Sequence, residues 1–330
     1  MQYKQKLYTL SGICSALFIA LVLTFVLDPE KSAARSAAWT PFNSKNTEKV
    51  EQIELNGNET VNLHKVNDKW FVNFEDADYP ARKEKIDDLF AGLTKSGAYA
   101  VRSKSESSHD KLGLGTDSAE RIIFRGANNT VLFDLFVGNM DTSGKEIYVR
   151  RAGESEVRSG ADIWTPYLNG ARTSWYELSF FPNHDKSGLT VENVQRLLVY
   201  PPAPEPDEAG NTTAKKENFV LARADGGWQI EGVSAIKVDT PKADSYVRFI
   251  LDSGGDDFIS ALKVTDPPFN TEGMGRLVIE FGDGTRKTIT LGEKFNEKNT
   301  AVISGVLYVF SLADWTVNRI WQDYNELEQK

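Results

Sequence analysis

The chain has 330 residues, of which 40% are hydrophobic and 26% are charged, and it carries a formal net charge of −9 at pH 7. These values are ordinary for a globular protein, and the length allows two domains with hydrophobic cores. The excess of acidic residues argues against binding of nucleic acid, or of anionic lipid head groups, through bulk charge.

An uncharged stretch of 21 residues, 7–27, lies near the start of the chain. A helix of this length spans roughly 30 Å, the thickness of the hydrocarbon core of a bilayer. Lysines precede the stretch and acids follow it, so the positive-inside rule places the N-terminus in the cytoplasm and residues 28–330 in a periplasmic or equivalent extracytoplasmic space. Residues 1–27 are therefore predicted to be a cytoplasmic tip and an inner-membrane anchor, with the apolar anchor residues Leu7, Leu17, Phe18, Leu21, Phe25 and Leu27.

A cleaved signal peptide and a lipoprotein anchor are the alternatives for this stretch. The apolar region of a signal peptide has about 7–15 residues and a small-residue cleavage site close behind it, whereas here the small residues begin only at Ala33. A lipoprotein would use Cys14, which lies inside the apolar stretch rather than just after it. Because Cys14 is the only cysteine, the exported part would contain neither a disulfide nor a thiol.

Residues 28–48 are mostly small and polar, and they predict a tether to a first domain at 49–178. The alternation of apolar and polar residues around Asn67-Asp68 predicts a hairpin. A helix is expected to start at Pro80, because the apolar residues that follow are spaced i, i+3, i+4 and i+7: Ile86, Leu89, Phe90 and Leu93. Strand patterns follow at 99–102, 121–125, 131–137 and 146–151, and an interrupted helical pattern covers 162–175.

After a connector at 179–192, a second domain at 193–330 shows the same landmarks in the same order. Each domain has a tryptophan that ends a hairpin, a proline that starts a helix, a glycine after an apolar run and a closing Trp-Thr pair: Trp70 and Trp228, Pro80 and Pro241, Gly138 and Gly292, and Trp164-Thr165 and Trp315-Thr316. We interpret the two segments as copies of one domain. The second copy has a proline-rich, acidic insertion at 201–217, which predicts an exposed flexible loop.

The order of these elements predicts an α+β fold. We expect an N-terminal single transmembrane helix followed by two repeated domains, each an antiparallel sheet with one or two packed helices.

The motifs that resemble catalytic or binding sites do not meet the chemical requirements of those sites. Asp252-Ser253-Gly254-Gly255 is like a serine-protease nucleophile segment, but a nucleophilic serine needs a base nearby. The histidines are scattered and none lies in the second domain: His64, His109 and His184. Residues 111–116 (KLGLGT) lack the spacing of a phosphate-binding Walker loop and predict a turn before a strand.

Metal ligation is not predicted either, because the exported part has no cysteine, no H-E-x-x-H motif and no EF-hand spacing. We therefore expect no catalytic residue, no metal and no cofactor. The tryptophans that recur in both copies could line a sugar or peptide groove, but their recurrence favours packing in the core.

Three runs in the first domain resemble the domain-of-unknown-function 4340 family: KLGLGTDSAERIIFRG (111–126), LFDLFVGNM (132–140) and EIYVRRAGESEVRSG (146–160). Gly113-Leu114, Gly138 and Tyr148-Val149 carry the likeness. In the second domain Pro267-Pro268 stands where Gly-Leu is expected, while Gly292 and Leu307-Tyr308-Val309 persist.

The resemblance implies a single-pass envelope protein with an accessory, non-catalytic role beside an ABC transporter that is similar to the gliding-motility type. The partners that it implies are the permease and an exported subunit of that transporter. Two alternatives stay open: an envelope hydrolase that acts on glycan or peptide, and an envelope scaffold without a transporter.

Overall fold

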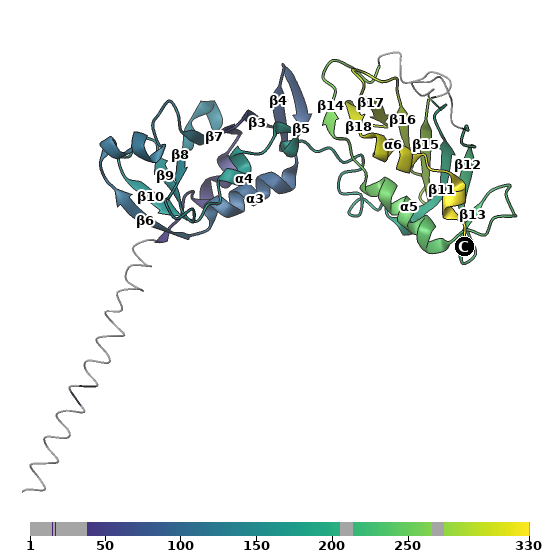
Figure 1. Ribbon diagram of the computed structural model, residues 1–330, viewed down its shortest axis with the longest axis horizontal. Helices are drawn as coiled ribbons and strands as arrows, with labels where there is room; N and C mark the ends of the chain where they lie inside the picture. The colour runs from purple at the N-terminus through teal and green to yellow at the C-terminus, as the bar shows by residue number, and fades with distance from the viewer. Residues whose placement is uncertain (1–14, 16, 18–37, 205–213, 266–273, 330) are drawn as a thin grey trace, which may run out of the picture. The chain divides into compact units, whose positions relative to one another are not determined.

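The computed structural model describes residues 15, 17, 38–204, 214–265 and 274–329, and it divides the chain into two compact units (Figure 1). The first unit contains Met1–Lys65 and Lys83–Arg172, and the second contains Val66–Arg82 and Thr173–Lys330. The hairpin within Val66–Arg82 lies in the predicted first copy, yet its contacts belong to the second unit.

An antiparallel sheet forms the centre of the first unit. Its strands, in spatial order, are β1 (Ala38–Trp39), β6 (Gly97–Ser103), β10 (Val157–Gly160), β9 (Ile147–Arg151), β8 (Val131–Met140), β7 (Glu120–Arg125), β2 (Gln52–Asn56) and β3 (Thr60–Val66). Short 3-10 helices connect them: η1 (Ser44–Lys49), η2 (Glu106–Ser108), η3 (Asp110–Leu112) and η4 (Ala127–Asn129). Another, η5 (Arg172–Trp175), follows the last strand of this sheet, at the boundary between the first and second units.

Helix α3 (Lys83–Thr94) covers one face of this sheet. Its buried residues are the predicted stripe of Ile86, Leu89, Phe90 and Leu93, and the ring of Phe90 meets Phe124 of β7 edge to face at 5.4 Å. Trp164, just before the short helix α4 (Thr165–Leu168), is fully buried and packs 6.0 Å from the ring of Tyr99.

A row of one aromatic and two cationic side chains crosses the other face of the sheet. Arg121, Phe136 and Arg150 lie opposite one another on β7, β8 and β9, and both guanidinium groups contact the ring of Phe136, at 4.6 and 4.4 Å. Arg150 is buried, and its Nη2 donates to the carbonyl oxygen of Leu114 at 3.0 Å. The buried arginine thereby holds the loop around Leu114 against this face, and its burial lowers the pKa of Arg150.

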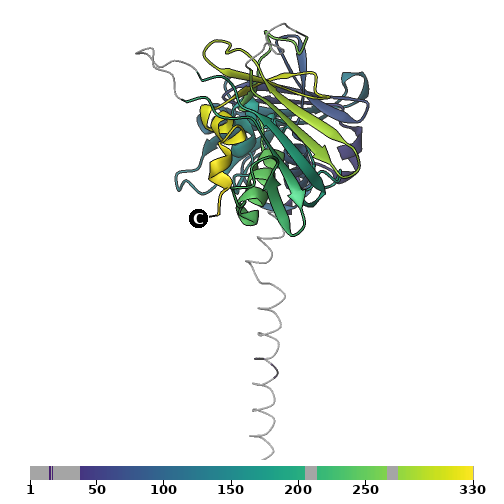
Figure 2. The same cartoon turned by 90° about the vertical axis from the view of Figure 1, so that its right-hand side faces the viewer.

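The second unit contains an antiparallel 8-stranded sheet. In spatial order its strands are β13 (Gly227–Ile230), β12 (Phe219–Ala224), β11 (Val194–Tyr200), β15 (Arg276–Phe281), β16 (Arg286–Leu291), β17 (Asn299–Ile303), β18 (Val309–Leu312) and β14 (Asp257–Phe258). Helices α5 (Thr240–Asp252) and α6 (Asp314–Ile320) lie side by side (Figure 2). The 3-10 helix η6 (Val191–Asn193) precedes β11, and η8 (Tyr324–Leu327) follows α6. The hydroxyl of Tyr246 on α5 donates to the carbonyl oxygen of Ile320 on α6 at 2.5 Å.

The hairpin of β4 (Lys69–Phe74) and β5 (Ala77–Pro80) is held in the second unit by aromatic packing. Tyr79 stacks on Phe258 with ring centroids 5.1 Å apart and also contacts the rings of Tyr176 and Tyr308. The hydroxyl of Tyr308 donates to the carbonyl oxygen of Asp78 at 2.8 Å. Aromatic pairs of this kind add about 0.5–1.5 kcal/mol each beyond the area that they bury.

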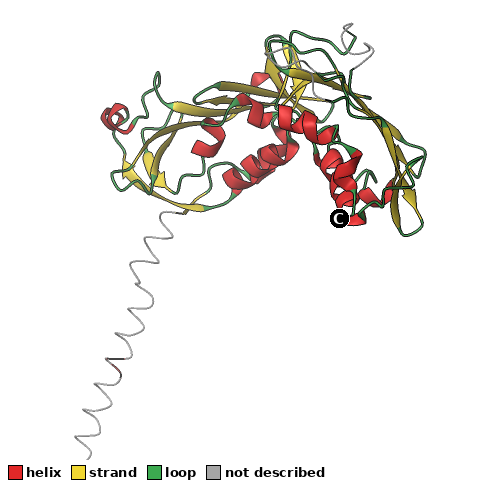
Figure 3. Ribbon diagram, turned by 45° about the vertical axis from the view of Figure 1, so that its right-hand side comes forward, coloured by secondary structure: helices red, strands yellow, loops and turns green. Residues whose placement is uncertain are grey.

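The predicted α+β class is wrong, because the described residues form two large antiparallel sheets with few helices (Figure 3). The helical pattern at 162–175 yields only α4 and η5. Pro166 lies in the first turn of α4, where a proline suits the start of a helix but not its interior, and α4 ends before Gly170. Pro80 does not start a helix but ends β5 opposite Phe71. Because hydrogen-bonded positions alternate along the pair, the N–H that Pro80 lacks would point away from β4, so the pairing loses no hydrogen bond. The next residue, Ala81, donates its N–H to the carbonyl oxygen of Trp70 at 2.9 Å.

The predicted fold class also included a transmembrane helix at residues 7–27. In the part of the chain that the structure describes, no helix is both long and apolar enough to cross a membrane. Apart from Ser15 and Leu17, residues 7–27 lie outside the described residues. The tandem-copy interpretation and its domain boundaries stay predictions.

Truncation of Phe258 tests the aromatic packing of the β4–β5 hairpin. Phe258→Ala should lower the free energy of unfolding by about 3–5 kcal/mol, because it removes a buried ring and leaves a cavity. Urea unfolding followed by tryptophan fluorescence measures the loss. Leu307→Ala is the control, since Leu307 is 79% exposed and should change stability by no more than about 0.5 kcal/mol. Equal effects of the two substitutions would contradict the packing described.

Buried tyrosines predict a loss of stability in alkali. Burial raises the pKa of Tyr99 to about 12 and raises the pKa of Tyr246 as well. Since both values lie above the ordinary tyrosine pKa of about 10, the unfolded chain ionises first. Full stability should therefore persist below about pH 10 and decline as pH rises toward 12. Tyr99→Phe should flatten this decline for the first unit, and an unchanged pH profile of unfolding would refute the assignment.

Candidate functional site

Of the predicted anchor residues, only Leu17 lies among those that the structure describes. It is helical and 65% exposed. The others lie outside the described residues: Leu7, Phe18, Leu21, Phe25 and Leu27.

The structure brings a histidine to the protease-like segment, which the sequence did not predict. His184 Nε2 lies 2.8 Å from Asp252 Oδ1, and His184 Nδ1 lies 3.1 Å from the carbonyl oxygen of Leu189. Ser253 is buried, and its Oγ donates to the carbonyl oxygen of Phe249 at 2.6 Å, as serines in a last helical turn do. In the described part of the chain no hydrogen bond joins Ser253 to His184, so the three residues are not arranged as a nucleophile with its base.

The other motifs occupy ordinary turns. Residues 111–116 run from η3 through Gly113, which has a φ of +72°, into the turn before β7. Within the described ranges, no group of three or more His, Cys, Asp and Glu side chains could hold a metal ion.

The core interpretation holds for Trp164 and Trp228, which are 0% and 5% exposed, but it is wrong for Trp315, which is 65% exposed. In α6 the buried positions are Thr316 and Ile320, one helical turn apart. Trp315 therefore points outward. In the first Trp-Thr pair the tryptophan, Trp164, is buried, whereas in the second pair the threonine, Thr316, is buried instead.

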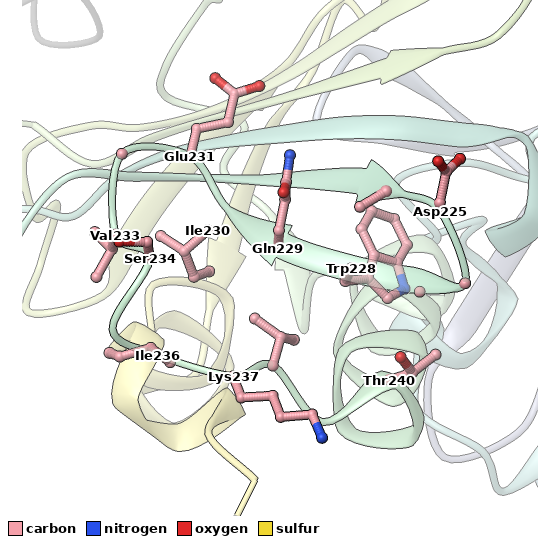
Figure 4. A pocket seen from close by; sticks show the side chains of 15 residues that line it. Asp225, Trp228, Gln229, Ile230, Glu231, Val233, Ser234, Ile236, Lys237 and Thr240 are labelled. Carbon is pink, nitrogen blue, oxygen red and sulfur yellow. The ribbon is translucent and has the colours of Figure 1, made fainter.

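A hollow of about 770 Å³ lies beside β13 in the second unit (Figure 4). Its walls are β13 with the turn before it and the segment 231–240 that leads to α5, and we call it the β13 hollow. Gln229 and Glu231 point to one side of the strand, while Ile230 points to the other side, toward Ile236 (Figure 4). Ile230 is buried and Ile236 half-buried, so the wall between strand and segment is partly apolar.

The strand that lines the hollow is an edge strand, and among the strands that the structure describes it pairs only with β12. The N–H of Glu231 donates to the carbonyl oxygen of Val220 at 2.9 Å. Because hydrogen-bonded positions alternate along an antiparallel pair, the N–H and C=O groups of Trp228 and Ile230 point away from β12. Among the described residues, only the C=O of Ile230 receives a backbone hydrogen bond, from Val233 N–H at 3.2 Å.

In the β4–β5 hairpin, the corresponding edge of β4 is covered by a paired strand. Ala81 N–H donates to the carbonyl oxygen of Trp70 at 2.9 Å, and Tyr79 lies opposite Val72. Because hydrogen-bonded positions alternate, the N–H and C=O groups of Trp70 and Val72 point toward this covering segment. Trp70 and Val72 occupy the positions in β4 that Trp228 and Ile230 occupy in β13.

Segment 234–237 holds the place of β5 in the chain but does not pair with β13. The correspondence follows from two pairs of matching backbone hydrogen bonds. In the first pair, Arg82 N–H donates to Trp175 O and Asp239 N–H donates to Leu327 O, each at 2.8 Å. In the second pair, Glu177 N–H donates to Pro80 O at 2.8 Å and Gln329 N–H donates to Lys237 O at 2.9 Å. Lys237 thus corresponds to Pro80, and Ile236 to Tyr79. The chain turns early, at Glu231-Gly232, where Gly232 has a φ of +78°, and the hollow lies between β13 and the segment that follows this turn.

Side-chain contacts fix the position of β13. Trp228 Nε1 donates to Asp244 Oδ1 on α5 at 2.8 Å, and the guanidinium of Arg223 lies 3.9 Å from the centre of the Trp228 indole. At Gly227 a Cβ would come within 2.2 Å of Thr240 Oγ1. The strand therefore lies close against the start of α5, and its open edge is pre-organised.

Sequence reasoning missed this site, although a signal for it exists. In the first hairpin, four residues separate Trp70 from the turn at Glu75-Asp76. In the second, only two separate Trp228 from Glu231-Gly232. The earlier turn after Trp228 predicts that the edge of β13 is left unpaired. This prediction can be made only when the two hairpins are already known to correspond.

Trp228→Phe tests the fixation of β13. The substitution retains most of the buried apolar surface but removes the hydrogen bond to Asp244, so unfolding should require about 1–2 kcal/mol less free energy. Trp315→Phe is the matched control at an exposed position and should have almost no effect. A double-mutant cycle with Asp244→Ala measures the coupling, and an absent coupling would contradict the contact.

Comparison with known proteins agrees with the resemblance seen in the sequence. The family described as Domain of unknown function (DUF4340) matches residues 70–271, which include all of β4 except Lys69, and the whole of β5 and β13. An uncharacterized protein of Treponema pallidum (strain Nichols) is 22% identical over 189 residues, covering 52% of this chain and 60% of that protein. No solved structure matches the chain. Since the match extends over more than half of its length, the chain belongs to the DUF4340 family of domains of unknown function.

Proposed function

We propose that the protein is a non-catalytic binding protein that docks a partner protein through its second unit. The observation that supports this proposal is the open edge of β13 beside a hollow of about 770 Å³. Proteins usually cover such an edge, because unpaired N–H and C=O groups are a template for pairing with another chain. An open edge that is held in place by side-chain contacts and bordered by a partly apolar wall fits a docking surface.

Two carboxylates, Glu231 in the lining of the hollow and Asp244 on α5, are engaged in structural contacts. The carboxylate of Glu231 accepts two hydrogen bonds from Arg196, at 2.9 and 2.8 Å, and Asp244 accepts from Trp228. These pairs favour binding over hydrolysis as the function of this part of the surface.

The identity of the partner is also a proposal. We propose that the protein works outside the cytoplasm with an ABC-type transport system similar to the gliding-motility type, and that it contacts the permease or the exported subunit. The sequence resemblance supports this part, and the family match adds no statement about function. An envelope hydrolase and a scaffold without a transporter are the alternatives.

Affinity purification of the full-length protein from its native cells in mild detergent, with mass spectrometry of the eluate, tests both parts. We expect the transporter's ATPase and permease to be recovered. Ile236→Asp should lower their recovery at least tenfold, because it places a charge in the apolar wall of the hollow. Leu307→Asp is the matched control at an exposed position of the same unit.

Two outcomes would contradict the proposal in different ways. Equal recovery with both variants would show that the β13 hollow is not the docking surface. Recovery of a partner other than transporter subunits would overturn the proposed identity while the docking function stands.

A further inference from the structure

We infer that the partner supplies an extended segment that adds to the sheet of the second unit as an antiparallel strand beside β13, in the place that β5 takes on β4. This inference rests on the proposed docking function and specifies how the partner is bound. It commits to a peptide strand as the occupant of the β13 hollow.

The backbone of β13 offers the contacts that a strand needs. The N–H and C=O of Trp228 and the N–H of Ile230 face the hollow, and the C=O of Ile230 can accept a second hydrogen bond beside that from Val233. These groups recur every second residue, which matches the repeat of an extended chain. Strand addition to an exposed edge obtains affinity from such main-chain bonds and specificity from alternate side chains.

The side chain opposite Ile230 defines the specificity. On β5 the corresponding residue is Tyr79, which lies opposite Val72 and is only 5% exposed. A residue paired with Ile230 would project on the same side of the sheet as Ile230, toward the half-buried Ile236. We therefore expect an apolar or aromatic side chain at this position of the partner, flanked by residues that face the other way.

The chain's own segment 233–237 does not close the edge, because the chain turns early at Glu231-Gly232 and Val233 N–H is turned back onto Ile230. The bond from Gln329 N–H to Lys237 O fixes only the far end of the segment, as the bond from Glu177 N–H to Pro80 O does beside the covered edge. The segment thus forms the far wall of the groove, and the strand position between this wall and β13 is left to another chain.

A synthetic peptide with the sequence of residues 75–82 (EDADYPAR), which contains β5, is the first probe. Added to the full-length labelled protein, it should shift the amide resonances of Trp228 and Ile230. N-methylation at the peptide's Tyr79 should weaken binding at least tenfold, because that N–H pairs across the ladder. N-methylation at its Asp78, whose N–H points away, should leave binding unchanged. No binding at millimolar peptide, or equal binding of both methylated peptides, would overturn the inference.

A closed-edge variant tests the inference without a peptide. Residues 231–237 are replaced by residues 73–80 (NFEDADYP), which supply a strand of the β5 type in the same chain. This variant should fold, lose peptide binding and lose partner recovery. A Gly/Ser replacement of equal length that keeps Ile236 is the matched control and should retain both, because it leaves the edge open and keeps the apolar side chain of the wall.

The outcomes separate this inference from the function on which it rests. If the closed-edge variant recovers the partner as well as the unaltered protein does, strand addition is wrong and docking elsewhere stands. If the unaltered protein recovers no partner, the docking function is wrong, and the two methylated peptides alone decide whether β13 accepts a strand.

Discussion

The alternation of hydrogen-bonding groups along an antiparallel strand is the constraint on which this structure depends. Each strand directs every second N–H and C=O to one neighbour and the rest to the other, so an open sheet ends in a row of unpaired groups unless another segment covers it. On β4 this row is taken by β5, through Ala81 and Tyr79. On β13 it borders a hollow of about 770 Å³. The difference between a covered and an open edge comes from a return segment that turns two residues earlier.

The covered edge is also where the second unit gains a large aromatic core. Tyr79 on β5 inserts among Tyr176, Phe258 and Tyr308, so pairing and packing stabilise the same strand. At β13 the contacts between Trp228, Arg223 and Asp244 stabilise the strand from the side of α5 instead. The unit can therefore keep an unpaired edge without losing order there, which a binding surface requires.

Local patterns in the sequence predicted local structure well. The stripe from Ile86 to Leu93 is buried in α3, and Asn67 and Asp68 adopt the positive φ values of a tight hairpin turn. Patterns failed where the outcome depends on distant pairing partners. Pro80 completes a strand whose partner is β4, and Trp315 lies on the outward side of α6 because Thr316 and Ile320 face inward. The β13 hollow could not be predicted, because an open edge is defined by a pairing that is not made.

Native-state amide hydrogen exchange of the free protein tests the central claim most directly, since it reports which strand edges are paired. The account predicts rapid exchange of the Trp228 and Ile230 amides and slow exchange of the Val72 amide, which faces β5. Slow exchange of Gln229, whose N–H faces β12, serves as the internal standard for a folded β13. Equal protection of Ile230 and Val72 would contradict the account, because it would mean that the edge of β13 is already covered.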